Sequence, residues 1–451
     1  MTETSIACLG GFVTAATPPP DARARAARAV LDTIGVTLAG AGEPAPRIVR
    51  EALAADGAGQ CVVLGTSMRT SAANAALANG TAAHALDFDD MCFVSLAHPS
   101  APLVPAALAA AELAAAAGPA LLDAYVVGFE IEGRLGRLMN PRHYQRGWHC
   151  TSTLGTIGAA AGASRLLGLD APAAGHALAI AASKASGLKE NFGTMVKPLR
   201  AGLAARNGIV AALLARGGMT ASARAIEGPQ GFLRAMDSEG TAMADAIADL
   251  GSRWEILDTG ITVKLYPSCA GTHPVLDALL DLRRREHFTP DDVTAIEICV
   301  DSITPTVLIH DRPSTGLEAK FSMPFCAAAA VVFGAVDIDT FEEGPLSDPR
   351  VFSVMPRVVM RVDPSLDGVG PPLTAARLAV TLRGGRVLRQ EAHGARGYPE
   401  RPASDEELES KFRACAKRAL SEDTAGRALE ILRRLEVLTD ARILADTLNA
   451  L

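Results

Sequence analysis

The chain has 451 residues, more than a single hydrophobic core usually holds, so two domains are expected. Hydrophobic residues make up 49% of it and charged residues 21%, which excludes a disordered protein. The formal net charge is -7 and no basic block alternates with aromatics, which excludes a nucleic-acid-binding protein. An anionic ligand would therefore be held by local cations and not by the field of the whole chain.

The cysteine spacing and the apolar runs of the sequence indicate where in the cell the protein is expected. The eight cysteines are scattered without a CxxC pair or zinc spacing, so neither structural zinc nor a disulfide framework is expected. Residues 1–20 lack the basic start of a signal peptide. The most apolar run, residues 101–118, is interrupted by Pro105 and Glu112, so no membrane span is predicted. These features predict a cytoplasmic protein that contacts neither membrane nor nucleic acid.

Residues 1–263 carry helical patterns throughout. In residues 21–39, Val30, Ile34 and Leu38 recur at helical spacing on one face. Further helices are predicted over 70–83, 106–117, 121–138, 151–166, 172–187 and 201–216. Their many small residues allow helices to approach closely. We expect one large all-helical domain.

Three carboxylates follow the helix over 70–83 within four residues, at Asp87, Asp89 and Asp90. They repel one another unless a cation or a hydrogen-bond donor lies among them. One interpretation is a solvated helix end, although a helix C-terminus is unfavourable for carboxylates. Metal binding is a weaker alternative because companion ligands at recognisable spacing are absent, so no metal is predicted.

A second polar group lies between residues 144 and 207. His149 precedes the helix over 151–166 and Lys197 precedes Pro198, which favours extended backbone at Lys197. The helix N-terminus that follows is a natural carboxylate site. Taken singly, His149 could fill a gap in the core and Lys197 could be a solvated cation. The other polar residues of this stretch are Tyr144, Arg146, Arg200 and Arg206.

The second half of the chain changes character at a polar junction that contains Lys264, Cys269 and His273. A helix over 275–285 is followed by strand patterns over 294–300, 357–362 and 377–382, the last before a hairpin turn at 383–386. Residues 264–398 are therefore predicted to form an α+β lid domain. In residues 399–451, Ser404 and Glu407 form a capping box before helices that return to the helical domain. The predicted fold class is mainly α.

The candidate site residues are acid–base groups among several cations, without a nucleophile elbow or a dinucleotide-binding fingerprint. Such a set suits abstraction of a proton next to a carboxylate. Cations neutralise the carboxylate and the developing charge, and a base of tuned pKa removes the proton. The set comprises Asp87, His98, Tyr144, Arg146, His149, Lys197, Arg200, Arg206, Lys264 and His273.

Six motifs also carry a family resemblance: His84-Ala85-Leu86-Asp87-Phe88-Asp89-Asp90, His98-Pro99-Ser100, Gly147-Trp148-His149, Lys197-Pro198-Leu199, Ala204-Ala205-Arg206-Asn207-Gly208 and Lys264-Leu265-Tyr266-Pro267. On these motifs, and over nearly its whole length, the chain resembles the MmgE/PrpD family. That family includes 2-methylcitrate dehydratase, cis-aconitate decarboxylase and iminodisuccinate epimerase.

The resemblance implies a helical domain completed by the C-terminal tail, a lid domain, a homodimer, and no metal or organic cofactor. It implies a di- or tricarboxylate substrate in the interdomain cleft. Asp87, His98, His149, Lys197 and Lys264 fall on the family's active-site pattern. We expect His149 or Lys197 to be the base. Tyr144 is a further expected catalytic residue, whereas Lys264, Arg206, Arg146, Arg200, Cys269 and His273 are expected to bind substrate.

Two positions indicate a branch of the family. Cys269 stands where the decarboxylase and the dehydratase carry His, and Phe325 stands where they carry Tyr. Pro267-Ser268-Cys269 and the run over 318–322 resemble the epimerase branch instead. The main prediction is therefore an epimerase-like enzyme that abstracts a Cα proton. The alternatives are a lyase of the dehydratase or decarboxylase type, and a carboxylate-binding paralogue without catalysis.

Overall fold

Close helix packing brings the segments of the later site together. The computed structural model describes residues 4–236, 243–371 and 373–449. Helices α4 (Ala72–Ala85) and α10 (Val196–Arg216) cross where Gly80 meets Gly202. A Cβ on Gly80 would lie 2.8 Å from the Gly202 Cα atom, so only glycine permits this approach. It sets the end of α4 beside the start of α10.

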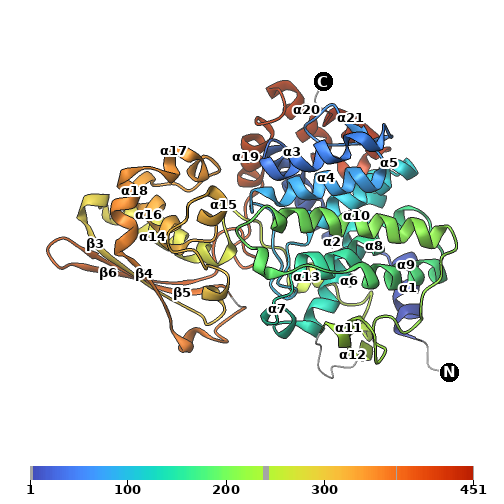
Figure 1. Ribbon diagram of the computed structural model, residues 1–451, viewed down its shortest axis with the longest axis horizontal. Helices are drawn as coiled ribbons and strands as arrows, with labels where there is room; N and C mark the ends of the chain where they lie inside the picture. The colour runs from blue at the N-terminus through green and yellow to red at the C-terminus, as the bar shows by residue number, and fades with distance from the viewer. Residues whose placement is uncertain (1–3, 237–242, 372, 450–451) are drawn as a thin grey trace.

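The helical part of the structure surrounds these two helices (Figure 1). Its other elements are α1 (Ser5–Ala15), α2 (Pro20–Gly40), α3 (Pro44–Leu53), α5 (Ser100–Ala114), α6 (Gly118–Met139), α7 (Arg142–Gln145), α8 (Cys150–Leu166), α9 (Ala171–Lys184), α11 (Phe232–Ala235), α12 (Met243–Ile247) and α13 (Glu255–Asp258). No helix in the described residues is both long and apolar enough to cross a membrane.

The sheet part lies at the other end of the molecule (Figure 1). Its four strands have the order β4-β3-β5-β6, with β3 and β4 parallel and the other pairs antiparallel. Helices α14 and α16 pack on one face of the sheet. Side chains in β3 alternate accordingly, with Ile296 and Ile298 buried and Glu297 exposed.

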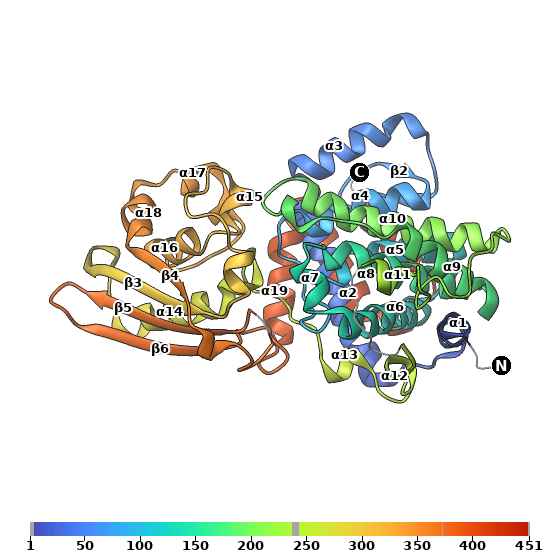
Figure 2. The ribbon, with the colours of Figure 1, turned by 60° about the horizontal axis from the view of Figure 1, so that its bottom comes forward.

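The strands and helices of the sheet part have these bounds: α14 (His273–Glu286), β3 (Val293–Val300), α15 (Gly316–Ala319), α16 (Met323–Phe333), α17 (Glu343–Leu346), α18 (Pro349–Val354), β4 (Val358–Val362), β5 (Ala375–Leu382) and β6 (Val387–His393). Figure 2 shows α15 beside the N-terminal end of α10. The two parts of the molecule therefore meet at the start of α10.

The C-terminal helices pack on the helical part (Figure 1). They are α19 (Asp405–Ala416), α20 (Glu422–Arg433) and α21 (Ala441–Thr447), and α19 begins with the predicted capping box. Helix α19 packs against α2, where Phe412 covers Gly35. Lys411 of α19 forms a buried ion pair with Asp32 of α2, with 2.7 Å between the charged atoms.

Three predictions about local structure were wrong. Lys197 lies in the first turn of α10 and not in extended backbone, because a proline in the first turn of a helix forfeits no hydrogen bond. Helix α5 begins at Ser100 and contains Pro105, ahead of the predicted start at 106. The helical part also contains a short antiparallel ladder, β1 (Cys61–Val62) with β2 (Arg69–Thr70), so it is not all helix.

Candidate active site

Asp87 is held by two lysines from distant segments. It follows α4 with a left-handed φ of 51°, a conformation that Asp tolerates better than most residues. Its carboxylate accepts hydrogen bonds from the Lys197 ammonium and, at 2.8 Å, from the Lys264 ammonium. Lys264 Nζ also donates to the Asp87 carbonyl at 2.9 Å. Burial alone would raise the pKa of Asp87, but the two lysine charges hold it well below its usual value.

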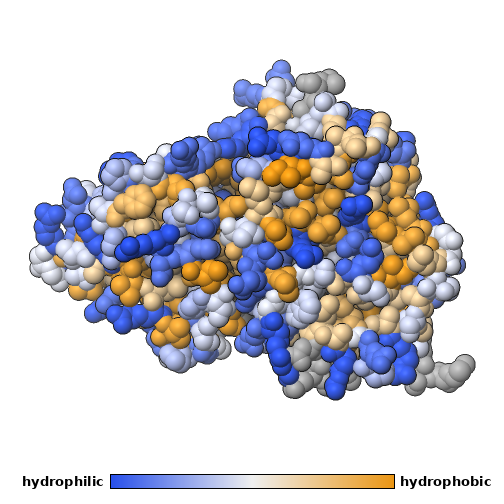
Figure 3. Space-filling model, viewed as in Figure 1, coloured by the Kyte–Doolittle hydropathy of each residue, from blue (hydrophilic) through white to orange (hydrophobic). Residues whose placement is uncertain are grey.

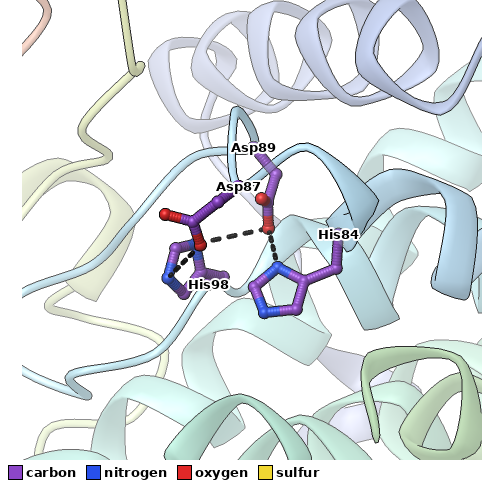
Figure 4. Close-up of side chains that lie close together, drawn as sticks. All are labelled: His84, Asp87, Asp89 and His98. Atoms are coloured by element: carbon purple, nitrogen blue, oxygen red, sulfur yellow. Dashed lines mark hydrogen bonds and ion pairs between the residues drawn. The ribbon is translucent and has the colours of Figure 1, made fainter. Parts of the chain in front are cut away.

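Asp89 lies between two imidazoles (Figure 4). Its Oδ2 atom lies 2.7 Å from His84 Nδ1 and 3.3 Å from His98 Nδ1. Burial alone would raise the pKa of Asp89, but these imidazoles hold it well below its usual value. Burial lowers the pKa of His98 to about 3 and also lowers that of His84, so both rings are neutral at pH 7.

Asp90 is the third carboxyl of the run and is uncharged near neutrality. Burial raises its pKa to about 8. It accepts hydrogen bonds from the backbone N–H of Ser100, at 3.2 Å, and from the Ser100 hydroxyl, at the start of α5. The Ser100 and Tyr125 oxygens are 2.6 Å apart. All three aspartates are buried, so the solvated helix end considered for them is wrong.

His149 has a buried imidazole ring that makes no hydrogen bond in the described residues. It is the N-cap of α8, and its backbone N–H donates to the Gly187 carbonyl at 3.0 Å. Neither ring nitrogen has a hydrogen-bond partner among the described residues. The ring stacks on His84, with centroids 5.7 Å apart. Burial, with the nearby charge of Lys197, holds the pKa of His149 well below its usual value. A neutral, unpartnered imidazole is available for proton transfer.

Two phenylalanines join the two parts of the molecule at this cluster. The Phe192 ring lies 5.2 Å from the His149 ring and 5.4 Å from Lys197 Nζ. Phe321, of the sheet part, packs against Phe192 at 5.6 Å and lies 5.0 Å from Lys197 Nζ. His149 and Lys197 are thus brought together around Phe192, at the meeting of the two parts.

A cavity of about 580 Å³ opens beside this cluster. One wall consists of the start of α3, the end of α4 and the start of α10, and the other consists of residues 315–320 and 338–343. Leu86 and Pro198 line it, and they are the chain neighbours of Asp87 and Lys197. Lys320 lines the opposite wall. The cavity therefore borders the cluster through residues next to it in the chain.

Arg200, Tyr144, Arg146 and Arg206 were also predicted as site residues, and they differ in burial and in their contacts. Arg200 donates to the Ser186 hydroxyl at 3.1 Å, beside the loop that holds His149. Tyr144 is buried beneath Lys189, whose Nζ lies 4.1 Å from the ring centroid. Arg146 is exposed after α7. Arg206 is partly exposed on α10 and forms no hydrogen bond or ion pair with the cluster in the described residues.

Cys269 and His273 approach from the sheet part. The Cys269 backbone N–H donates to the Lys320 carbonyl at 2.9 Å, and burial raises the pKa of its thiol to about 11. His273 Nε2 lies 3.1 Å from the Ser268 carbonyl oxygen, and the His273 ring packs edge-on against Tyr266. Burial lowers the pKa of His273 to about 3. This contact holds the His273 ring against the backbone of Ser268 in the junction.

The candidate set predicted from the sequence omitted several residues of the cluster. His84 and Asp89 were within a recognised motif, and their spacing of five residues across a helix end could have indicated a pair. Lys320 and Phe321 were within the run 318–322. The sequence carries no local signal for Phe192, because its role depends on packing between segments.

The cluster also resembles a metal site. Ligand atoms of His84, Asp87, Asp89 and His98 all lie within 4.8 Å of one another (Figure 4). However, the Lys197 and Lys264 ammonium groups already bind the Asp87 carboxylate. A divalent cation would compete there with two buried positive charges. The donor set therefore suits an ion-paired acid–base site better than a metal centre.

Comparison with known proteins gives two domain matches. Residues 11–243 match the MmgE/PrpD N-terminal domain and residues 266–437 match the MmgE/PrpD C-terminal domain.

Similar proteins extend over most of the chain. Cis-aconitate decarboxylase of Homo sapiens is 31% identical over 388 residues, which cover 83% of this chain and 79% of the relative. The cis-aconitate decarboxylase-like protein oryM of Aspergillus oryzae is 29% identical over 446 residues, 94% of this chain and 92% of the relative. Cis-aconitate decarboxylase of Aspergillus terreus is 27% identical over 455 residues, 96% and 92% of the two chains.

Proposed function

Because the chain belongs to the MmgE/PrpD family, we propose that it is a cofactor-independent lyase that removes CO2 from a small tricarboxylate of the cis-aconitate type. Similarity to relatives named cis-aconitate decarboxylase supports this lyase activity over the epimerase activity that Cys269 and Phe325 predicted. The mechanism begins from the observation that His149 is buried, neutral and without a hydrogen-bond partner in the described residues.

Decarboxylation breaks a carbon–carbon bond and leaves its electron pair on the substrate, where a proton must then be added. Burial holds the pKa of His149 well below its usual value, so the ring is neutral before a substrate binds. A polyanionic substrate beside the ring favours the imidazolium and raises its pKa, so His149 takes up a proton from solvent. After CO2 departs, the ring passes this proton to the carbon. Lys197 is less suited to this role, since Asp87 holds its ammonium.

The charges around His149 stabilise the transition state. Lys197 and Lys264 are fixed by Asp87 and cannot turn away when negative charge develops on the substrate. His98 lies between Asp87 and Asp89, 3.9 Å and 3.3 Å from their carboxylate oxygens. The two ammonium groups and the neutral His98 ring are already in position, so they need no reorganisation during the reaction.

The test is release of CO2 from cis-aconitate by the purified chain. We expect His149→Ala to lower kcat by roughly two to four orders of magnitude, the usual contribution of acid–base catalysis. Lys197→Met should lower kcat by roughly two to three orders of magnitude, the usual cost of removing one oriented charge or donor. Lys184→Met, at the end of α9, is a matched control that should keep the parent rate. Circular dichroism and the unfolding temperature check the fold. Unchanged turnover in both site variants would refute the assignment.

A second candidate function is epimerisation, which Cys269 and Phe325 favour. The Cys269 thiol has a pKa raised to about 11, and Phe325 packs 5.8 Å from the Phe341 ring in the apolar core of the sheet part. Neither side chain supplies a ready acid where the lyases of the family are expected to carry His and Tyr. An epimerase exchanges the Cα proton of a dicarboxylate with deuterated solvent without releasing CO2. Exchange without CO2 release would favour this candidate, and the reverse outcome would favour the lyase.

We further propose that the chain works as a homodimer in the cytoplasm. The helical part exposes large apolar side chains near α9 and α10, including Leu188, Met195 and Met219. Figure 3 shows apolar groups among charged ones on the face over the helical part. Sedimentation or light scattering at micromolar concentration measures the mass. A mass of one chain would contradict the dimer.

A further inference from the structure

Lys320 is a buried cation at the cavity wall. Only 4% of the residue is exposed, and Nζ donates to the Pro267 carbonyl at 2.9 Å. Nζ also lies 4.3 Å from the centroid of the Phe341 ring. An ammonium has three N–H donors, and the described residues satisfy one of them.

The other buried lysines differ from Lys320 in one respect. Lys197 and Lys264 form ion pairs with Asp87, and Lys411 forms an ion pair with Asp32. In the described residues, Lys320 has no carboxylate within 4 Å. A buried ammonium without a counter-ion is unfavourable, because the hydration that it loses on burial is not replaced by an ion pair.

The surroundings of Lys320 leave its charge available to a ligand. Glu43, across the cavity, and Asp87 both favour the ammonium form, whereas Lys264 opposes it. The Cys326 thiol lies nearby but its pKa is raised by burial, so it is neutral. Two of the carboxylates that line the cavity are engaged elsewhere: Glu342 accepts from Arg418 at 2.6 Å, and Glu318 accepts from the Ser314 backbone N–H at 2.7 Å.

We propose that Lys320 is a substrate-binding residue that pairs with a carboxylate of the bound tricarboxylate, the one turned away from His149. The assignment rests on the proposed function for the identity of the substrate. Lys197 and Lys264 are each paired with Asp87, so Lys320 is the cavity-lining lysine whose ammonium can take a further substrate carboxylate as its counter-ion. The ligand provides the missing counter-ion, and the cavity of about 580 Å³ holds the rest of it.

The experiment measures binding of tricarballylate, a tricarboxylate without the reactive double bond, by calorimetry on the full chain. Lys320→Met removes the charge and the donor. Lys320→Gln removes the charge but keeps an N–H group for the Pro267 carbonyl. Both are expected to weaken binding about 10- to 100-fold, the effect of losing one hydrogen bond between charged groups. Lys417→Met, an exposed lysine at the end of α19, is the control and should bind as the parent does.

Two further measurements separate binding from a structural role. The unfolding temperature of Lys320→Met should be equal to or above that of the parent, because the variant removes an unpaired buried charge. Burial lowers the pKa of Lys320 to about 8, so parental binding should weaken above pH 8 and binding by Lys320→Gln should not follow that dependence. Parental affinity in both variants, or no binding by the parent, would overturn the proposal.

The outcomes also separate this proposal from the lyase. Tricarballylate binding that depends on Lys320 in a chain that releases no CO2 from cis-aconitate would support the binding site and refute the lyase. CO2 release with unchanged affinity in Lys320→Met and Lys320→Gln would support the lyase and refute the role of Lys320.

Discussion

The Asp87 carboxylate is the most informative group to change. Asp87→Asn keeps the size of the side chain and removes the charge that holds Lys197 and Lys264. Both ammonium groups then remain buried, at 4% and 0% exposure, without a carboxylate. The variant therefore tests whether the pairing of these lysines supports both the fold and the reaction.

The expected magnitude follows from burial. Removing one partner of a buried ion pair costs about 3–5 kcal/mol, since the charge left behind has lost its hydration. The Asp87 pair is screened little by solvent, so the loss should not fall below this range. Lys264 retains its 2.9 Å hydrogen bond to the Asp87 carbonyl, which limits the loss. We expect Asp87→Asn to lower the free energy of unfolding by about 3–4 kcal/mol and to reduce kcat as Lys197 and Lys264 lose their fixed positions.

The assay is a double-mutant cycle with Lys264→Met, followed by chemical denaturation and turnover. Lys264→Met alone leaves Asp87 with one lysine, while the double variant removes one of the two orphaned ammonium groups. The double variant should therefore be more stable than the sum of the single effects predicts, by about 1–3 kcal/mol of coupling. Additive effects, or a loss below about 1 kcal/mol for Asp87→Asn, would refute the buried pairing.

Three other predictions concern the supports of the site. Lys411→Met removes the donor to the Phe88 and Lys264 carbonyls, both at 2.8 Å, and leaves the buried Asp32 carboxylate without its lysine. The free energy of unfolding, measured by denaturant titration, should fall by about 3–5 kcal/mol. An unchanged free energy would contradict this prediction. Glu132 is buried with a pKa raised well above its usual value, so the folded state binds the extra proton and stability falls as pH rises above 4.5. Glu132→Gln should raise the unfolding temperature at pH 8 and change it little at pH 4; a decrease at pH 8 would show that the carboxylate is needed. The pKa of His98 is lowered to about 3, so between pH 6.5 and 3 the unfolded chain binds a proton at His98 that the folded chain does not. His98 should therefore contribute a loss of about 1.4 kcal/mol in the free energy of unfolding for each unit by which the pH falls in that window. His98→Gln should make this acid dependence shallower, and an unchanged slope would assign it to other groups.

The sequence by itself determined the local elements. The helical period of residues 21–39 and the small-residue helices depend on neighbours three and four positions apart, and the structure has helices α2, α4, α6, α8 and α10 there. The hairpin at residues 383–386 and the capping box at Ser404 depend on local backbone geometry, and both are present. The MmgE/PrpD motifs were recognisable because each lies within a short continuous segment of the chain.

Contacts between distant segments were decided only by the tertiary structure. The sequence left Asp87, Asp89 and Asp90 as one acidic run, whereas the structure gives each a different state: paired with lysines, hydrogen-bonded to His84, or protonated beside Ser100. These states depend on burial and on partners up to 177 residues away in the chain.

Long-range contacts also distinguish three lysines that look similar in the sequence. Lys197, Lys264 and Lys320 each lie close to a proline or an aromatic residue in the chain, and nothing local predicts which of them is ion-paired. The packing of the sheet part against the start of α10 brings Lys197 and Lys264 to Asp87. It leaves Lys320 at the cavity wall, where no carboxylate of the described residues forms an ion pair with it. Hydration, which sets the free energy of a buried charge, depends on the folded surroundings and not on the neighbours in sequence.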